Sequence, residues 1–193
     1  MKTGHGSHFF PGGMAAIALG ALVFGLCSSG APAEDPPHGE SIKVTSPAFE
    51  SGQPIPAEFT CAGGDQSPML QWSGAPAGAK SFALICEDPD APSGTWTHWV
   101  LYNLPAGTAA LSEKTATSET LPNGALQGVN DFHRVGYSGP CPPPGKAHRY
   151  FFKVYALDTM LALKPRATRQ ELLHAMEGHI LTDGQLTGTY QKK

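Results

Sequence analysis

The sequence predicts a mostly β protein, and three features point to that class. Glycine (23 residues) and proline (18 residues) are abundant for a chain of 193 residues, while charged residues make up only 15%. This composition favours many turns between short strands over long, charged surface helices. Several segments have the length and apolar density of sheet strands, and one segment near the C-terminus has the pattern of a helix.

The first segment along the chain has the features of an export signal. Residues 14–27 (MAAIALGALVFGLC) are apolar and uncharged, but this run is shorter than the roughly 20 residues that a membrane-spanning helix requires. Residues 31–33 (APA) then give the small-x-small pattern that signal peptidase accepts. We therefore expect a signal peptide over residues 1–33, an exposed linker over residues 34–42, and export to the periplasm or the medium.

Two features of this segment leave alternatives open. Lys2 is the one full positive charge ahead of the apolar run, so Met14 is an alternative start. Cys27 follows the apolar run, as a lipidated cysteine would. However, Leu26 stands where a small residue is expected before such a cysteine.

Residues 43–193 have the size of one domain with a buried core. Without Lys2, the chain carries 12 Lys and Arg against 16 Asp and Glu, a formal charge of −4. It contains no basic run. Nucleic acid is therefore not an expected partner, because phosphate binding leaves a basic footprint.

The N-terminal half of this domain contains three expected strands. Ile42 and Val44 alternate with polar residues in a first strand within residues 41–49. The prolines at positions 54 and 56 then show that the following segment is not a central strand of a sheet, because proline has no N–H to donate. Residues 69–72 are expected to form a short strand. Residues 80–87 (KSFALICE) are expected to form a buried strand because of their length and apolar density.

Two longer strands with distinct faces follow. In residues 96–104, the period of two places His98, Val100 and Tyr102 on one face and Trp99, Leu101 and Asn103 on the other. In residues 149–157, Tyr150, Phe152, Val154 and Ala156 share one face, opposite Phe151, Lys153 and Tyr155. Residues 104–128 are expected to be loop with at most one short strand. Trp72, Trp99 and Phe151 are expected in the core.

One helix is expected near the C-terminus. Thr168 and Glu171 have the spacing of a capping box, and the apolar residues that follow form a stripe that should pack on the sheet. Gly178 can end this helix in the left-handed conformation.

Three cysteines follow the predicted cleavage site: Cys61, Cys86 and Cys141. In an oxidising compartment they predict one disulfide and one free thiol, unless two chains pair as a homodimer. The sequence does not choose among the pairings. Cys86 has the character of a small buried hydrophobic residue.

Polar residues concentrate in three loops, each attached to a strand end. Pro89 and Pro92 rigidify the loop that carries Asp88 and Asp90. By the period of two, His98 shares a strand face with Trp96, and His148 shares one with Tyr150. These groups can converge on one cavity.

Segments 88–94 (DPDAPSG), 96–99 (WTHW) and 138–150 (SGPCPPPGKAHRY) resemble the signature segments of the phosphatidylethanolamine-binding proteins. Segments 59–72 and 94–105 are similar to the bacterial, Raf-kinase-inhibitor-like branch of that family, and the resemblance extends from about Val44 to Tyr190. It implies two antiparallel sheets with Greek-key connections and a pocket for anions such as phosphate esters. The pocket residues that it implies are Asp88, Asp90, Pro92, Trp96, His98, Gly139, Pro140, His148 and Tyr150.

The expected function is therefore binding of a small anionic or zwitterionic group, with no cofactor, no metal and no catalysis. Because members of the family inhibit kinases and a serine carboxypeptidase, a protein target such as a protease or a kinase is also expected. The alternative is a hydrolase or metalloenzyme that uses the same His, Asp and Tyr side chains. Against it, residues 136–139 (GYSG) continue with Pro140 where a nucleophile elbow has glycine, and the histidines lack metal-ligand spacing.

Overall fold

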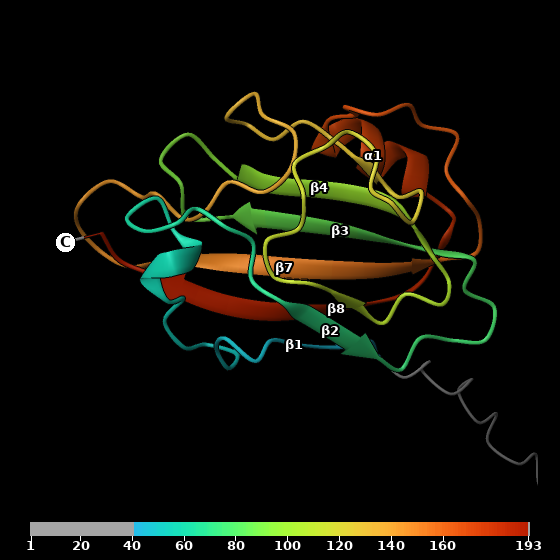
Figure 1. Cartoon of the computed structure of the whole chain (residues 1–193), viewed down its shortest axis with the longest axis horizontal. Coiled ribbons are helices and arrows are strands. Elements are labelled where there is room, and N and C mark those ends of the chain that lie inside the picture. The colour runs from blue at the N-terminus through green and yellow to red at the C-terminus, as the bar shows by residue number, and fades with distance from the viewer. Residues whose placement is uncertain (1–40, 193) are drawn as a thin grey trace, which may run out of the picture. The chain divides into compact units, whose positions relative to one another are not determined.

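The computed structural model describes residues 41–192. These residues form two antiparallel sheets and one α-helix (Figure 1), which confirms the predicted fold class. The predicted signal peptide and nearly all of the predicted linker lie outside the described residues. In the described part, no helix is long and apolar enough to span a membrane.

The larger sheet has five strands in the order β6-β4-β3-β7-β8. Their bounds are β3 Ser81–Asp88, β4 Trp96–Pro105, β6 Leu126–Gln127, β7 His148–Leu157 and β8 Ile180–Tyr190. The smaller sheet has the order β1-β2-β5, with β1 Lys43–Thr45, β2 Leu70–Ser73 and β5 Ala110–Leu111. After β4 the chain crosses to the smaller sheet as β5 and returns as β6. It then comes back as β7 beside β3, a connection of the Greek-key type.

Two apolar clusters cover the two faces of the larger sheet. Between the sheets, Phe82 and Leu84 of β3 pack with Trp72 of β2 and with Phe152 of β7. On the opposite face, Ile85 packs with residues of α1 (Arg169–Met176). Because successive strand residues point to opposite faces, β3 is buried along its whole length.

The helix follows the sequence prediction. The Thr168 hydroxyl accepts the Glu171 N–H, and the Glu171 carboxylate accepts the Thr168 N–H, so the capping box is complete. Leu172 and Met176 are buried against the sheet, and Gly178 has a φ of 77° just after the helix.

Two bulges in β4 change which residues share a face. Its pairing with β3 shifts register between Phe82 and Leu84 and again between Cys86 and Glu87. At the second shift, Trp99 pairs with Cys86 and Thr97 with Glu87, so His98 is the extra residue. The prediction that His98 shares a face with Val100 and Tyr102 was therefore wrong. Those two residues pack in the helix-side cluster, whereas the His98 ring contacts Tyr150.

Two other expectations need correction. Phe151 is half-buried on the outer face of β7, where Arg149 and Lys153 lie over its ring at 5.5 and 5.6 Å, so it is not a core residue. Trp72 and Trp99 are buried as expected. Residues 104–128 contain two short strands, β5 and β6, and not one.

The sequence did not predict β8, which pairs with β7 along nearly its whole length. Its outer edge is covered by the N-terminal part of the domain. Gly52 and Ile55 donate backbone hydrogen bonds to Thr187 and Thr189, and Ile42 donates to Asp183. This cover protects an edge that would otherwise be open to pairing with another chain.

Candidate functional site

A cavity of about 200 Å³ lies where β3 ends and where β4 and β7 begin. The cavity continues the inner face of the larger sheet. Asp88 lies two positions after Cys86 on β3 and therefore on the same face, and its partner on β4 is Trp96. Six of the nine predicted site residues line it. The lining residues are Asp88, Ala91, Pro92, Ser93, Trp96, His98, Phe132, Cys141, Pro142, Pro143, His148 and Tyr150.

Asp88 organises one side of the cavity. Its carboxylate is buried, with Oδ1 accepting the Asp90 N–H at 2.8 Å and Oδ2 lying 2.8 Å from His148 Nδ1. A carboxylate only accepts hydrogen bonds, so His148 Nδ1 carries the proton of this contact. The Nε2 atom of His148 is thereby left for a ligand.

His98 is oriented in the same way by a carbonyl group. Its ring is 2% exposed, and Nδ1 donates to the Ser138 carbonyl at 2.6 Å. Burial lowers the pKa of His98 below its ordinary value of 6.5, while the carbonyls of Ser138 and Gly139 and the charge of Asp88 oppose this shift. At neutral pH, the ring is a neutral imidazole whose Nε2 lone pair accepts hydrogen bonds.

Tyr150 supplies a hydroxyl donor. Its side chain is fully buried, and in the described part of the chain Oη has no hydrogen-bond partner. The Asp88 carboxylate, whose oxygens accept the Asp90 N–H and the His148 Nδ1–H, still has free lone pairs and acts on this hydroxyl, but its contact with Oη does not have the geometry of a hydrogen bond. Burial and the nearby charge of Asp88 raise the pKa of Tyr150, so the hydroxyl keeps its proton at all physiological pH values. A buried donor without a partner at a cavity wall favours an acceptor atom in that cavity.

Aromatic and proline side chains form the other walls. Phe132 packs edge-on against Trp96 and His98, with ring centroids 5.5 and 5.3 Å apart. The buried Asn130 side chain holds this loop, because its amide group donates to Gly136 and Ser138 and its oxygen accepts the Phe132 N–H. Asn130 therefore positions both Phe132 and the residue whose carbonyl orients His98.

The cavity lies within the part of the chain that matches a known protein family. A model of the family described as phosphatidylethanolamine-binding protein matches residues 45–191, which include every lining residue of the cavity. The chain belongs to the phosphatidylethanolamine-binding protein family.

Relatives in the family come from archaea and bacteria. A UPF0098 protein of Methanothermobacter thermautotrophicus is 51% identical over 151 residues, covering 78% of this chain and 99% of the relative. A UPF0098 protein of Aquifex aeolicus is 45% identical, covering 90% of this chain and 99% of the relative.

Two solved structures of the family share the fold. The homologue CT736 of Chlamydia trachomatis is 42% identical with a TM-score of 0.72, covering 79% of this chain and 99% of its own. YbcL of E. coli is 35% identical with a TM-score of 0.75, covering 80% of this chain and 100% of its own. YbcL is described as a new member of the mammalian PEBP family.

The remaining three predicted site residues of this family member do not line the cavity. Asp90 forms a two-pronged ion pair with Arg149, at 2.9 Å from Nε and 2.8 Å from Nη2, and also accepts the Arg149 backbone N–H. This contact lowers the pKa of Asp90 well below its ordinary value. Asp90 thus attaches the acidic loop to β7 and does not face the ligand space.

Gly139 and Pro140 attach the Gly-Pro loop to the segment after η1 (Ala57–Phe59). The Gly139 N–H donates to Asp65 Oδ1 at 2.6 Å, so the structure does not leave this donor for an anion. A Cβ atom at Gly139 would lie 2.3 Å from the Phe59 carbonyl oxygen, which explains the need for glycine at this close approach. The Pro140 carbonyl accepts the Cys61 N–H.

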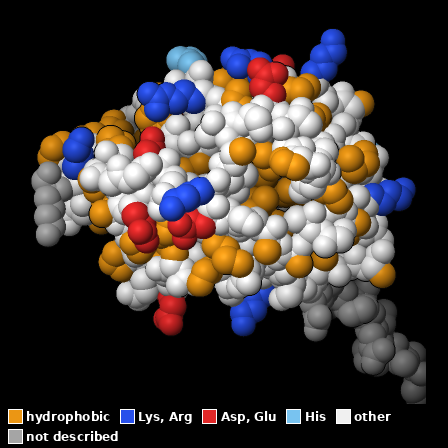
Figure 2. Space-filling model, viewed as in Figure 1, with side chains coloured by type: hydrophobic (Ala, Val, Ile, Leu, Met, Phe, Trp, Pro, Cys, Tyr) orange, Lys and Arg blue, Asp and Glu red, His pale blue; other side chains and the backbone are white. Residues whose placement is uncertain are grey.

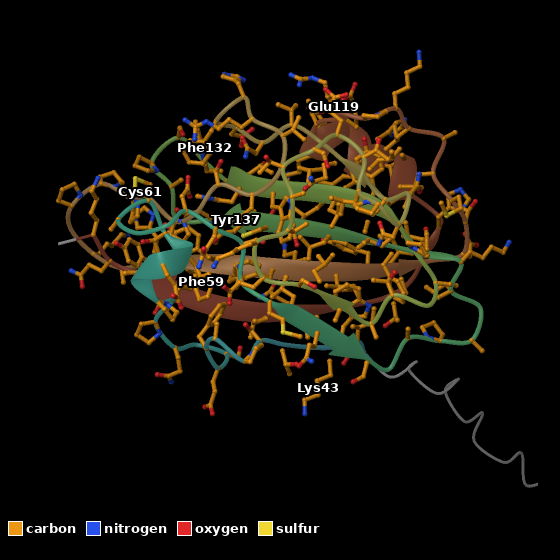
Figure 3. The ribbon with its side chains drawn as sticks, viewed as in Figure 1. Lys43, Phe59, Cys61, Glu119, Phe132 and Tyr137 are labelled. Atoms are coloured by element: carbon orange, nitrogen blue, oxygen red, sulfur yellow. A yellow bond between two sulfur atoms is a disulfide. The ribbon has the colours of Figure 1, made fainter. Side chains whose placement is uncertain are left out.

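A disulfide between Cys61 and Cys141 joins the same two segments. Figure 3 shows Cys61, Phe59 and Tyr137 near the end of the sheet at which β3 stops. The expected single disulfide is thereby confirmed, with the pairing that the sequence left open. Cys86 is a free, buried thiol whose pKa is raised by burial, in agreement with the expectation that it is a small core residue.

Sequence reasoning missed Phe132 and the proline wall. Pro142 and Pro143 lie within the 138–150 segment, two residues after the Gly139-Pro140 pair that was predicted to contact the ligand. Phe132 lies in a loop between short strands, where no periodicity indicates its direction. Only its aromatic character, between Asp131 and His133 in a polar stretch, could have marked it.

The structure also describes the groups considered for the enzyme alternative. Ser138 Oγ accepts a hydrogen bond from Asn130 at 3.0 Å, and its backbone carbonyl, not its hydroxyl, contacts His98. Within residues 41–192, no group of three His, Cys, Asp or Glu side chains is arranged to hold a metal ion.

Proposed function

We propose that this protein is an exported binding protein whose pocket holds a small phosphate-bearing group without turning it over. The observation that carries the proposal is the polar end of the cavity. There the unpartnered Tyr150 hydroxyl lies beside two histidines whose Nδ1 atoms are hydrogen-bonded to the protein and whose Nε2 atoms are left for a ligand. Proteins of this family are generally ligand-binding, which supports the proposal.

The size of the cavity favours a head group over a whole lipid or a drug-sized molecule. Its volume of about 200 Å³ lies below the roughly 300–1,000 Å³ of sites that enclose drug-sized ligands. A phosphoryl oxygen can accept from Tyr150, and a protonated phosphoryl oxygen or a protonated His98 completes the contacts. The faces of Trp96 and Phe132 suit an alkyl or ammonium group, so phosphoethanolamine is a suitable probe.

Export is part of the proposal because two independent features favour it. Residues 14–33 have the apolar run and cleavage pattern of a signal peptide, and the domain contains a disulfide, which persists in oxidising compartments. N-terminal sequencing of protein from the exported fraction should give Glu34 as the first residue. A chain that retains residues before Ala31, or one found only in the cytosol, would contradict export.

Calorimetric titration with phosphoethanolamine tests binding. His98→Ala and His148→Ala should each weaken affinity by about 10- to 150-fold, the effect of losing one charge-assisted hydrogen bond worth roughly 1.5–3 kcal/mol. His174→Ala is the matched control, because the His174 side chain is exposed on α1 and does not line the cavity. Equal affinity in all four proteins would overturn the binding site. Hydrolysis of the ligand that the two site variants abolish would establish the enzyme alternative instead.

Affinity for an anion should rise on mild acidification. The pKa of His98 lies below 6.5 in the free protein, and an anion favours the protonated ring, so binding takes up a proton as the pH falls below about 6.5. Phosphate esters themselves titrate near pH 6. The sulfate ester of ethanolamine is therefore the matched ligand, since its charge is constant in this range. Its affinity should increase between pH 7.5 and 5.5 in the wild type and increase less in His98→Ala, whereas a flat or falling wild-type profile would refute this role of His98.

A further inference from the structure

The Cys61–Cys141 disulfide lies at the rim of the pocket and on the surface of the protein. Both cysteines are exposed, and Cys141 lines the cavity together with Pro142 and Pro143. An exposed disulfide is accessible to thiolates, and accessibility is one of the conditions for thiol–disulfide exchange. The buried Cys86 thiol is not accessible in this way.

The disulfide is the covalent anchor of this pocket wall, in which Pro142 is also buried by packing. Residues 142–144 are prolines without a backbone N–H. Across the described part of the chain, the one hydrogen-bond contact of residues 141–144 is that between Lys192 Nζ and Cys141 Sγ, at 3.9 Å. The preceding residues have separate anchors, since Gly139 donates to Asp65 and Pro140 accepts from Cys61. Opening the disulfide therefore leaves residues 141–144 held by the packing of Pro142, between the Gly-Pro loop and Gly145, whose carbonyl accepts a hydrogen bond from Gln191 Nε2.

The two sulfur atoms differ in their electrostatic surroundings. The Lys192 ammonium group lies beside Cys141 Sγ, and a neighbouring cation stabilises a cysteine thiolate. In an exchange reaction, the better-stabilised thiolate is the better leaving group. An incoming thiolate should therefore attack Cys61 Sγ and expel Cys141.

We propose that this disulfide is a thiol–disulfide exchange site that takes small thiols and dithiols, and that exchange loosens the pocket wall. The incoming thiolate forms a bond to Cys61 Sγ while the Cys61–Cys141 bond breaks, and the electron pair leaves on Cys141 Sγ beside Lys192. With a dithiol, the second thiolate attacks the mixed disulfide and expels Cys61. The protein disulfide is then reduced to two thiols, and the dithiol is oxidised to its own disulfide.

Mapping the mixed disulfide tests the direction of exchange. The intact exported protein is incubated briefly with glutathione, quenched, alkylated and analysed by peptide mass spectrometry. Glutathione should be found on Cys61 and the alkyl group on Cys141, with an excess over the opposite arrangement of up to about fivefold, the effect of one unit charge near 4 Å in water. Lys192→Gln should abolish this excess, whereas Lys146→Gln, an exposed position in the loop that contains Cys141, should retain it.

Three outcomes of this experiment would overturn the proposal. They are a mixed disulfide mainly on Cys141, an excess on Cys61 that Lys192→Gln does not change, and no exchange in the native protein under conditions in which the urea-unfolded protein exchanges. Near-UV circular dichroism of each variant shows whether it is folded, so a folding defect is not mistaken for a change in reactivity.

The effect on the pocket rests on the proposed ligand-binding function and has its own readout. Titration of oxidised and dithiol-reduced protein with phosphoethanolamine should show roughly three- to tenfold weaker binding after reduction, since a loosened wall must be ordered again on binding. Reoxidation should restore the affinity. Equal affinity in both states would overturn the loosening of the wall. If the oxidised protein does not bind the probe at all, the proposed function fails while the exchange site is still decided by mass mapping.

Discussion

Tyr150 and Trp72 carry the buried polar side-chain atoms that have no hydrogen-bond partner in the described part of the chain. Such an atom costs free energy in the folded protein, because it gives up water without a replacement. Trp72 lies in the core between the sheets, whereas Tyr150 lines the cavity. At the residue scale, the cost at Tyr150 is relieved when a ligand supplies an acceptor.

Replacing Tyr150 with phenylalanine should separate stability from binding. Tyr150→Phe removes the unpartnered hydroxyl, so the free energy of unfolding should stay within about 0.5 kcal/mol of the wild type or increase. Affinity for phosphoethanolamine should fall by roughly 10- to 150-fold, since a charge-assisted bond is lost. Urea unfolding and calorimetry measure the two effects.

Tyr137→Phe is the matched control. The Tyr137 hydroxyl is also buried, but it donates to the Phe59 carbonyl at 2.8 Å and does not line the cavity. Its loss should destabilise the protein by about 1–3 kcal/mol and leave the affinity unchanged. If Tyr150→Phe destabilises the protein as much as Tyr137→Phe does and binds normally, the Tyr150 hydroxyl is structural.

Residue-scale prediction succeeded where one strand held two polar groups and failed where loops or bulges intervened. The period of two correctly placed His148 and Tyr150 on the inner face of β7, whose burial alternates from His148 to Ala156. The period of two also correctly placed His98 with Trp96, since both line the cavity, but the bulge at His98 separates it from Val100 and Tyr102, which a regular period does not predict. The sequence also could not show that Nδ1 of each histidine is hydrogen-bonded within the protein, because the partner residues are 40 and 60 positions away.

At the element scale, β7 and β8 show why one strand was predicted and its neighbour was not. β7 contains aromatic and aliphatic residues at every second position, whereas β8 reads ILTDGQLTGTY, with two glycines and few apolar residues. Glycine normally weakens a strand, so this composition favoured a loop. Both glycines are closely approached by the N-terminal part of the domain: a Cβ atom at Gly184 would lie 1.7 Å from the Ile42 carbonyl oxygen, and one at Gly188 would lie 2.4 Å from the Ile55 side chain.

Gly184→Ala should therefore be strongly destabilising. The added methyl group would overlap backbone atoms that cannot rotate away, so the first strand of the domain must move off β8 at a cost of about 3 kcal/mol or more. Gly107→Ala is the matched control, since a Cβ atom there would meet nothing within 4 Å. Chemical unfolding of both variants measures the difference, and equal stabilities would show that residues 41–45 do not pack on β8 in solution.

At the scale of the described domain, charge gives little organisation to the visible surface. Figure 2 shows Lys and Arg side chains scattered singly over the face in view, with acidic side chains in small groups between them. The long-range order comes instead from the sheet pairing and from the disulfide, which links positions 80 residues apart. The disulfide connects the segment after η1 to the loop that enters β7, and both segments border the cavity end of the sheet.

Removing this cross-link should lower the stability of the whole domain. A cross-link that closes a loop of 80 residues restricts the unfolded chain, and the chain-entropy model gives about 4–5 kcal/mol for a loop of this length, with measured values of roughly 2–5 kcal/mol. The double variant Cys61→Ser/Cys141→Ser should lose a corresponding free energy of unfolding in urea.

A dithiol should shift the unfolding midpoint of the wild type and not that of the double variant, because Cys86 is the one cysteine left in the described domain and has no partner to lose. A loss below about 1 kcal/mol would mean that the two segments are already held together in the unfolded state or that the bond does not form in the isolated protein. Counting thiols in the denatured domain distinguishes these two explanations, since a formed Cys61–Cys141 bond leaves Cys86 as the one free thiol of residues 41–192.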